Sequence, residues 1–310
     1  MYFVKWAIKK ELKIFNLENG KSRTMTPNVG EFSKFLDKIK KESLLYFEEG
    51  GGDSFKLLAR RKGHQIFTLP GIRTKERRED LEIPKTDEND ALAIKLLIKE
   101  CPEDFYEFKE LDEITARISI IFKERADTEK IMVATKLRLF ALKNRLELVD
   151  LDGYEEEAME KKEAIIQALE EDFELQTKLL QAEVRKHPVW NDYLKGIKGV
   201  GPVVAGGLIT GIKRASRFTD KYALRQYAGM VTKKGNQKFN HQLKRALFHF
   251  SEEIIRQNTP IWRKLYDDMK IYYSDKHPDW KKGKINNYAK KFIQTKFLNE
   301  LHEEMKMVER

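Results

Sequence analysis

Cysteine is almost absent from this chain: Cys101 is the only one among 310 residues. This excludes an internal disulfide and a zinc site built from several cysteines. No apolar run approaches the ~20 residues that a membrane-spanning helix needs, and the N-terminus has no secretory signal. The sequence also contains no internal repeat and no low-complexity tract. These absences predict an intracellular, cytoplasmic protein without a membrane partner.

Acidic residues are scarce in the C-terminal part of the chain. Between His187 and His249 only Asp192 and Asp220 are acidic, against twelve Lys and Arg. Residues 186–310 hold 26 Lys and Arg against 12 Asp and Glu, whereas the net charge of the whole chain is +10. Such a one-sided charge density favours a nucleic-acid partner over a merely solvated face.

The first hundred residues alternate between strand and helix patterns. Beta-prone residues predict strands at 2–8, 12–17, 44–47 and 65–69, and the spacing of apolar residues predicts helices at 29–39, 54–62 and 88–99. Strands that alternate with helices indicate an α/β domain, and the opening strand pair indicates a mixed sheet.

Two long charged helices, 106–149 and 154–186, follow this domain, with their apolar residues three or four positions apart. They predict an antiparallel, coiled-coil-like hairpin without a clean heptad. This arm either dimerises, holds an extended partner or serves as an intramolecular spacer.

Beyond the arm the pattern is helical. Five aromatic residues there are interleaved with Lys and Arg, and we expect most of them to be core and some to stack on bases: Tyr222, Tyr227, Phe239, Phe248 and Phe250.

The stretch from Leu194 to Ile212 has the pattern of helix, tight glycine turn and helix. Gly199 and Gly201 permit positive φ, and Pro202 suits the first turn of the second helix. The free N–H groups at that helix start can bind a phosphate oxygen. The spacing is that of a helix-hairpin-helix. The alternative is a tight turn between core helices that binds no ligand.

Three carboxylates in the N-terminal half are candidates for metal chemistry. Glu48 follows a strand and precedes a glycine run, and Asp87 and Asp90 share one face of a helix start. Carboxylates in this arrangement can hold Mg²⁺, and paired metal ions about 4 Å apart serve phosphodiester chemistry. On spacing alone we favour the alternative, in which Asp87 caps its helix and Asp90 is a solvated acid of the first turn.

A family resemblance rests on three sets of segments. The first set is Phe47 to Gly52, followed by Gly63-His64 and Pro70. The second is the aspartate pair within Lys85 to Ala91. The third lies in the C-terminal part and consists of Gly199 to Pro202, Phe218, Tyr227 to Met230 and Asn240 to Lys244. Together they resemble the DEDD transposases of insertion-sequence family 110, the Piv/MooV invertase type. The tail agrees as well at Trp262 to Tyr266 and Ala289 to Leu298, so the resemblance covers nearly the whole chain.

The resemblance implies a RuvC/RNase H-like domain over residues 1–102, a coiled-coil arm over 103–186 and a helical transposase domain over 187–310. It implies DNA as a partner, a structured guide RNA of the bridge type, and a homodimer or tetramer. Glu48, Asp87 and Asp90 match the second, third and fourth acids of the family's magnesium-holding set, which works with a serine nucleophile.

Two catalytic positions of the family have no clear counterpart in this sequence. The register of the first strand puts Trp6 where the family has its first aspartate, and Glu11 on the next strand is a weak substitute. The loop after Met230 contains no serine, and Thr232 is its only hydroxyl. Three carboxylates hold two divalent ions less well than four, and without a nucleophile no covalent intermediate forms.

We therefore expect a transposase-like protein that binds DNA or structured RNA while its recombination is impaired. Its predicted nucleic-acid contacts are Lys195, Lys198, Gly199, Gly201, Lys213, Arg214, Arg217, Lys233, Lys234, Asn240, Lys244 and Arg245. One alternative is an active Mg²⁺-dependent recombinase or nuclease that uses Glu48, Asp87 and Asp90. A second is a scaffold built on the helical arm, against which the basic surplus argues.

Overall fold

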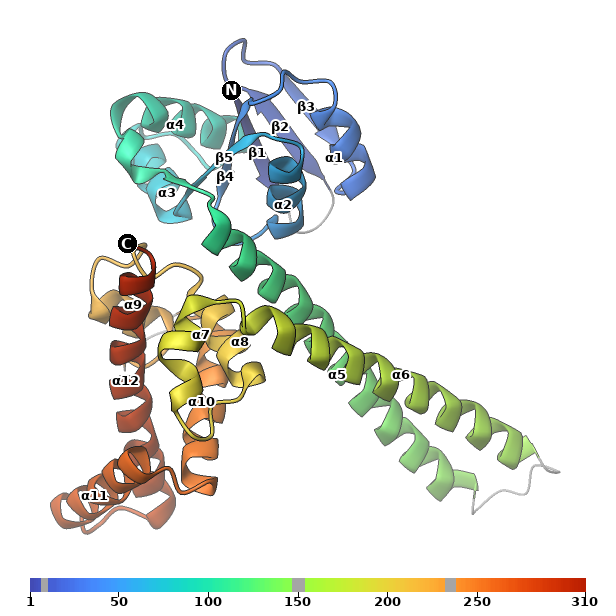
Figure 1. Cartoon of the computed structure of the whole chain (residues 1–310), viewed down its shortest axis with the longest axis vertical. Helices are drawn as coiled ribbons and strands as arrows, with labels where there is room; N and C mark the ends of the chain where they lie inside the picture. Colours follow the sequence, from blue (N-terminus) through green and yellow to red (C-terminus); the bar gives the residue numbers. More distant parts are fainter. Residues whose placement is uncertain (7–10, 147–153, 232–237) are drawn as a thin grey trace. The chain divides into compact units, whose positions relative to one another are not determined.

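The computed structural model describes residues 1–6, 11–146, 154–231 and 238–310 (Figure 1). The chain divides into two units, Met1–Ala116 and Arg117–Arg310, and helix α5 (Glu110–Leu146) belongs to both. The helical arm is thereby grouped with the C-terminal region, and the boundaries at residues 102 and 186 stay predictions. None of the described helices is long and apolar enough to cross a membrane.

The N-terminal unit is built on a six-stranded mixed sheet of order β3-β2-β1-β4-β5-β6. Strand β4 pairs in parallel with both β1 and β5, and the remaining pairs are antiparallel. The predicted α/β unit with a mixed sheet is therefore confirmed. The strands are β1 (Tyr2–Trp6), β2 (Leu12–Asn16), β3 (Ser22–Met25), β4 (Leu44–Glu48), β5 (Gln65–Leu69) and β6 (Tyr106–Glu107).

Helices cover both faces of this sheet (Figure 1). On one face Phe3, Phe15 and Leu69 pack against Ile94 and Leu97. The helices of this unit are α1 (Val29–Leu36), α2 (Asp53–Arg61), α3 (Gly71–Asp80) and α4 (Asp87–Glu100).

On the opposite face the Trp6 ring lies 5.0 Å from the Phe55 ring of α2, and the Tyr2 ring lies 5.6 Å from the Phe35 ring of α1. Because side chains alternate along a strand, Phe3 and Lys5 of β1 project toward the α4 side.

Two strands and one α-helix of this unit were missing from the sequence prediction: β3, β6 and α3. The prediction assigned residues 106 and 107 of β6 to the first arm helix, which begins only at Glu110. Strand β3 carries the polar residues Ser22, Arg23 and Thr24, and it gains its order from pairing with β2. Strand β6 has only two residues, and α3 is so rich in charge that it lacks an apolar stripe. Hydrophobic periodicity cannot find elements of this kind.

The C-terminal unit is helical. After the arm helix α6 (Tyr154–Val184) it contains α7 (Pro188–Asp192), the 3₁₀ turn η2 (Leu194–Gly196), α8 (Pro202–Ile212), α9 (Lys221–Tyr227), α10 (His241–Arg256), α11 (Pro260–Lys276) and α12 (Lys282–Val308). The helical pattern predicted beyond the arm is therefore confirmed.

The arm is an antiparallel pair of helices (Figure 1). Thr128 of α5 donates a 3.0 Å hydrogen bond to Asp172 of α6, and nearer the tip Lys143 and Glu163 form a 3.1 Å ion pair. The antiparallel hairpin is thus confirmed, whereas a coiled coil stays a prediction. The break predicted at residues 150–153 lies outside the described residues.

Helix α8 is closely packed by its neighbours. A Cβ added at Gly206 would lie 3.2 Å from Leu180 of α6, and one at Gly211 would lie 2.9 Å from Leu243 of α10. The glycines of this helix therefore serve close helix packing, in addition to the turn at Gly199.

Of the five aromatic residues singled out in the sequence, Phe250 is fully buried and stacks on Phe297 at 3.8 Å. Tyr222 and Phe248 are almost half exposed, at 45% and 49%.

His187 gives the C-terminal unit a sensitivity to acid. It is buried, caps α7 and accepts a 3.3 Å hydrogen bond from the Val189 N–H through Nδ1. Burial lowers the pKa of His187 to about 4. Protonation would charge a buried ring and remove this acceptor.

We therefore expect the unit to lose stability between about pH 6.5 and pH 4, where the unfolded state binds the proton more readily. Because folding lowers the pKa of His187, the free energy of unfolding does not change with pH above the pKa of the unfolded state, about 6.5. It falls by up to about 3 kcal/mol as the pH drops from there to about 4. Urea unfolding at a series of pH values measures this. His187→Asn keeps a capping acceptor without a titrating ring, so a pH dependence identical in this variant and the wild type would contradict the assignment.

Candidate functional site

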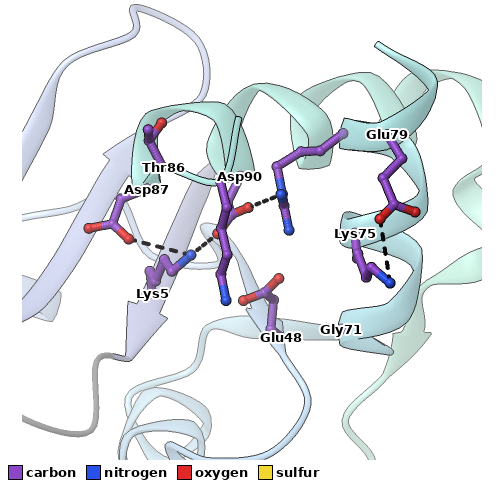
Figure 2. A pocket seen from close by; sticks show the side chains of 10 residues that line it. Lys5, Glu48, Gly71, Lys75, Glu79, Thr86, Asp87 and Asp90 are labelled. Atoms are coloured by element: carbon purple, nitrogen blue, oxygen red, sulfur yellow. Dashed lines mark hydrogen bonds and ion pairs between the residues drawn. The ribbon is translucent and has the colours of Figure 1, made fainter. Parts of the chain in front are cut away.

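The three carboxylates singled out in the sequence lie around one pocket of about 610 Å³ in the N-terminal unit (Figure 2). Glu48 ends β4, and Asp87 and Asp90 lie in the first turn of α4. Because β1 and β4 are parallel, their carboxyl ends meet at the same edge of the sheet, and α4 begins there.

Thr86, rather than Asp87, caps helix α4. The Thr86 hydroxyl accepts a 3.1 Å hydrogen bond from the Asn89 N–H, and the Asn89 amide donates a 2.8 Å bond to the Pro84 carbonyl. This corrects the expectation that Asp87 is the capping residue. It leaves the Asp87 and Asp90 carboxylates directed toward the pocket, on the shared face that their spacing predicts (Figure 2).

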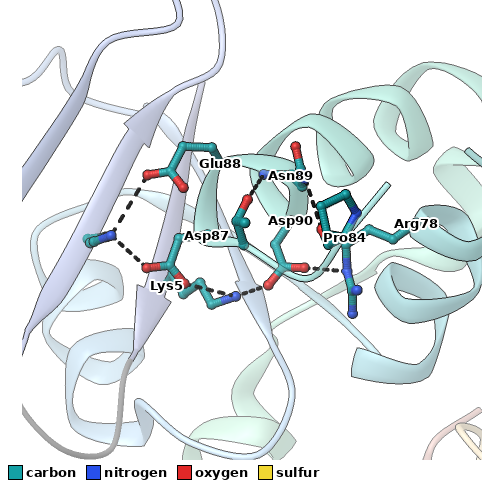
Figure 3. Close-up of polar contacts among 9 residues, drawn as sticks. Lys5, Arg78, Pro84, Asp87, Glu88, Asn89 and Asp90 are labelled. Carbon is teal, nitrogen blue, oxygen red and sulfur yellow. Dashed lines mark hydrogen bonds and ion pairs between the residues drawn. The ribbon is translucent and has the colours of Figure 1, made fainter. Parts of the chain in front are cut away.

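Positive side chains engage both aspartates (Figure 3). Lys5 of β1 forms ion pairs with Asp90 and, at 3.4 Å, with Asp87. Arg78 of α3 pairs with Asp90 at 2.5 Å, and Lys13 of β2 pairs with Asp87 at 2.7 Å. The Asp90 side chain is 3% exposed, so its charge is buried together with its partners, and the expectation that Asp90 is a solvated acid is wrong.

The cations change the titration of Asp87. The hydrogen bond from Lys13 lowers the pKa of Asp87, with further lowering by the charge of Lys5, while burial opposes both. The same hydrogen bond raises the pKa of Lys13. Asp87 therefore stays ionised and paired at neutral pH.

Lys5 is the functional residue that the sequence analysis missed. The sequence register placed Trp6 at the position of the first acid of the family. In the structure Trp6 packs on the α2 side of the sheet, where its Cδ1 would lie 2.9 Å from a Cβ added at Gly51. Glu11 is exposed and is not among the residues that line the pocket. Strict alternation along β1 could have identified Lys5, because it shares a face with the core residue Phe3.

Within the described residues no group of three His, Cys, Asp or Glu side chains is arranged to hold a metal ion. The carboxylates of Asp87 and Asp90 instead have ammonium and guanidinium partners. The role of Glu48, Asp87 and Asp90 as magnesium ligands stays a prediction.

In the C-terminal unit the glycine turn leads into helix α8 as predicted, but the segment before it is the 3₁₀ turn η2 (Leu194–Gly196) rather than the predicted helix. Gly199 adopts φ 98°, whereas Gly201 is extended and precedes α8, which has Pro202 in its first turn. Of the two glycines, Gly199 alone adopts the positive φ that both permit. The Thr259 hydroxyl donates a 2.6 Å hydrogen bond to the Lys198 carbonyl and braces the turn.

A cavity of about 900 Å³ opens at this turn, lined by residues 199–204 together with Arg125 and Arg245. The N–H groups in the first turn of α8 have no partner within the helix, as in any helix. No side chain caps them either, so they stay open. Burial lowers the pKa of the Arg125 guanidinium, and the positive charge of Arg245 lowers it further, against the opposing effect of Glu129. The cavity lining contains four basic side chains, Lys123, Arg125, Lys130 and Arg245, and three acidic ones, Asp127, Glu129 and Glu253. The helix N-terminus and this small positive surplus favour a negatively charged ligand here.

The predicted basic contacts do not form one patch. Arg245 lines the cavity and Lys198 directly precedes its Gly199, whereas Lys195 lies in η2 and Lys213 follows the end of α8, about 16 Å away along an 11-residue helix. Arg214 and Arg217 follow Lys213, and Lys233 and Lys234 lie outside the described residues.

Several of the predicted contacts have partners within the protein. The Arg217 guanidinium lies over the rings of Phe218 and Tyr227, at 4.5 and 4.6 Å. Asn240 caps α10 and donates a 2.7 Å hydrogen bond to the Tyr227 hydroxyl, and the Lys244 Nζ lies 4.3 Å over the Phe239 ring. These residues therefore contribute to the local fold.

Comparison with known families identifies one domain. Residues 191–267 match the Transposase IS116/IS110/IS902 family, and this match spans the hairpin, α8 to α10 and the start of α11. A transposase domain of this family implies DNA transposition. The carboxylate pocket lies outside the matched residues. No curated protein matches the chain.

The ion pairs of Asp90 make a stability prediction. Asp90→Asn should lower the free energy of unfolding by about 3 kcal/mol, because Lys5 and Arg78 stay buried with one negative charge fewer. Glu79→Gln is the matched control, since Glu79 lines the same pocket with a side chain 61% exposed, and it should cost less than about 0.5 kcal/mol.

Urea unfolding in EDTA and in millimolar Mg²⁺ provides the measurement. With its aspartates already paired, the wild type should unfold at the same urea concentration in both buffers. A midpoint raised by Mg²⁺ in the wild type and not in Asp90→Asn would contradict the ion-pair interpretation.

Proposed function

We propose that this chain is a nucleic-acid-binding protein of DNA transposition in which metal-dependent recombination is impaired. The observation that carries the proposal is the transposase match over residues 191–267, which contains the hairpin and the Arg245 side of the cavity beside it, while Arg125 belongs to α5 outside the match. The strand order of the N-terminal unit is compatible with the RuvC/RNase H-like fold that the family resemblance implies.

The hairpin supplies the binding chemistry. Open N–H groups at the start of α8 can hold one phosphate oxygen, and Arg125 and Arg245 can share the charge of the same or a neighbouring phosphate. A bound phosphate would also relieve the repulsion between these two arginines. Lys195 and Lys198 are exposed beside this site and can extend the contact along a backbone.

Lys5 supports the impairment of catalysis. Magnesium needs unpaired carboxylate oxygens, and the Lys5 ammonium, with Arg78 and Lys13, balances the charge of Asp87 and Asp90. The residues present therefore fit a pair of metal ions poorly. The sequence adds the absence of a serine between Arg217 and His249, so the serine nucleophile of the family has no counterpart in the loop after Met230, where Thr232 is the only hydroxyl.

Two partners follow from the same proposal: a structured guide RNA beside the DNA, and a second copy of the chain in a homodimer or tetramer. The alternative function, an active Mg²⁺-dependent recombinase, is favoured by the convergence of Glu48, Asp87 and Asp90 on one pocket.

The binding proposal predicts a change in salt dependence. Replacing Lys198 and Arg245 by Ala should weaken binding to a DNA duplex at least tenfold. It should also reduce the slope of log Kd against log salt by about one for each lost phosphate contact. Fluorescence anisotropy over a range of salt concentrations measures both quantities.

The matched control removes two lysines from the arm, Lys143 and Lys161, which pair with Glu163 and Glu157. If the control and the hairpin variant lose the same affinity, the hairpin is not the contact. The nucleic acid that co-purifies with the wild type is sequenced in parallel. A discrete RNA supports the guide-RNA partner, and heterogeneous DNA alone contradicts it.

The impairment predicts that Mg²⁺ leaves the protein inactive on DNA. Wild type, Glu48→Gln and Asp87→Asn should give the same background in a cleavage and strand-exchange assay with Mg²⁺ or EDTA. Activity in the wild type that needs Mg²⁺ and disappears in both variants would establish the recombinase alternative.

A further inference from the structure

A cluster of aromatic rings lies where α11 leads into α12, beyond the residues that match the transposase family. The rings of His277 and Trp280 stack at 3.9 Å, and Tyr288 lies 4.6 Å from Trp280. Tyr273 lies 5.7 Å from Tyr288 and 5.3 Å from Tyr272. We call these five residues the α11–α12 ring cluster.

The ring cluster is open to solvent, unlike the aromatic core of the same unit. Tyr272 and Tyr288 are 48% and 42% exposed, whereas the core residues Trp262 and Phe297 are 7% and 0% exposed. Phe292 lies one helical turn beyond Tyr288, is 37% exposed and extends the aromatic surface. Flat apolar rings presented together to solvent indicate a binding surface.

The surroundings of the ring cluster are basic. Residues 276–284 contain four lysines and one acid, Asp279. The Lys284 Nζ lies 3.8 Å over the Trp280 ring, and the Lys276 Nζ lies 5.2 Å over the Tyr272 ring. In the part of the chain that the structure describes, no carboxylate forms an ion pair with the four lysines: Lys276, Lys281, Lys282 and Lys284.

We propose that the α11–α12 ring cluster binds unpaired bases of a single-stranded nucleic acid. Aromatic rings stack on the faces of bases whatever their sequence, and neighbouring lysines neutralise the phosphates that link them. A duplex hides its base faces, so this surface discriminates single strands from double strands, in contrast to the hairpin. The inference rests on the proposed function that the chain binds nucleic acid.

The test removes the flat rings and keeps apolar side chains. The full-length double variant Tyr272→Leu, Tyr288→Leu is compared with the wild type by fluorescence anisotropy. Three labelled probes of about 20 nucleotides are used: single-stranded DNA, single-stranded RNA and duplex DNA. We expect the affinity for single strands to fall about tenfold or more, because two stacking surfaces are lost. The affinity for the duplex should stay within about twofold.

The matched control is Ile261→Ala, Ile271→Ala, which removes two exposed apolar side chains, 80% and 63% exposed, from the same helix without removing a ring. It should bind all three probes as the wild type does. An unchanged affinity of the tyrosine variant for single strands overturns the inference, as does an equal loss on single strands and duplex. A wild type that binds duplex but no single strand overturns this inference alone, and one that binds no probe overturns the proposed function itself.

Thermal melting checks that the variants are folded. If the tyrosine variant melts early, the intact protein supplies a second measurement. Trp280 is one of four tryptophans, so the fluorescence lost on adding single-stranded oligonucleotide is compared between the wild type and Trp280→Phe. Quenching that is smaller in Trp280→Phe supports contact of bases with the ring cluster, and equal quenching in both proteins overturns it.

Discussion

The buried charge of Asp90 is the constraint on which the N-terminal unit depends. A carboxylate that is almost fully removed from water needs positive partners, and it obtains them from Lys5 of β1 and Arg78 of α3 while itself belonging to α4. One ionic cluster thereby connects a central strand with the two helices at the carboxyl edge of the sheet. The arrangement that gathers acids at this edge also supplies the cations that neutralise them.

The two units use charge in different ways. In the N-terminal unit acids and bases pair with one another around the pocket, so little net charge is left for a ligand. Over residues 186–310 of the C-terminal unit, basic side chains outnumber acids about two to one, and the helix start at Gly201 adds N–H groups without a capping side chain. The separation of Lys198 from Lys213 along α8 means that a bound backbone would have to follow the helix to meet both.

Sequence alone predicted the elements that have a clear apolar pattern, including β5, α1 and α2, and it predicted the long helices of the arm from a looser pattern. It also predicted that Asp87 and Asp90 share a face with Glu48 nearby. It could not predict β3 or α3, because β3 is stabilised by its neighbour in the sheet and α3 by ion pairs such as that between Arg73 and Asp104. Lys5 was missed for a related reason: composition marks a lysine as a surface residue, and only the pairing of β1 with β2 and β4 reveals which face it occupies.

The glycines of α8 have a mechanical consequence. At Gly206 the helix meets Leu180 and Val184 of the arm helix α6, and at Gly207 it meets Phe122 of α5, with no side chain of its own between the backbones. Contacts this close are nearly incompressible, so a displacement at the base of the arm passes directly to α8. The N-terminus of α8 is the wall of the hairpin cavity. A displacement of α5 or α6 at the base of the arm would therefore move α8 and with it one wall of that cavity.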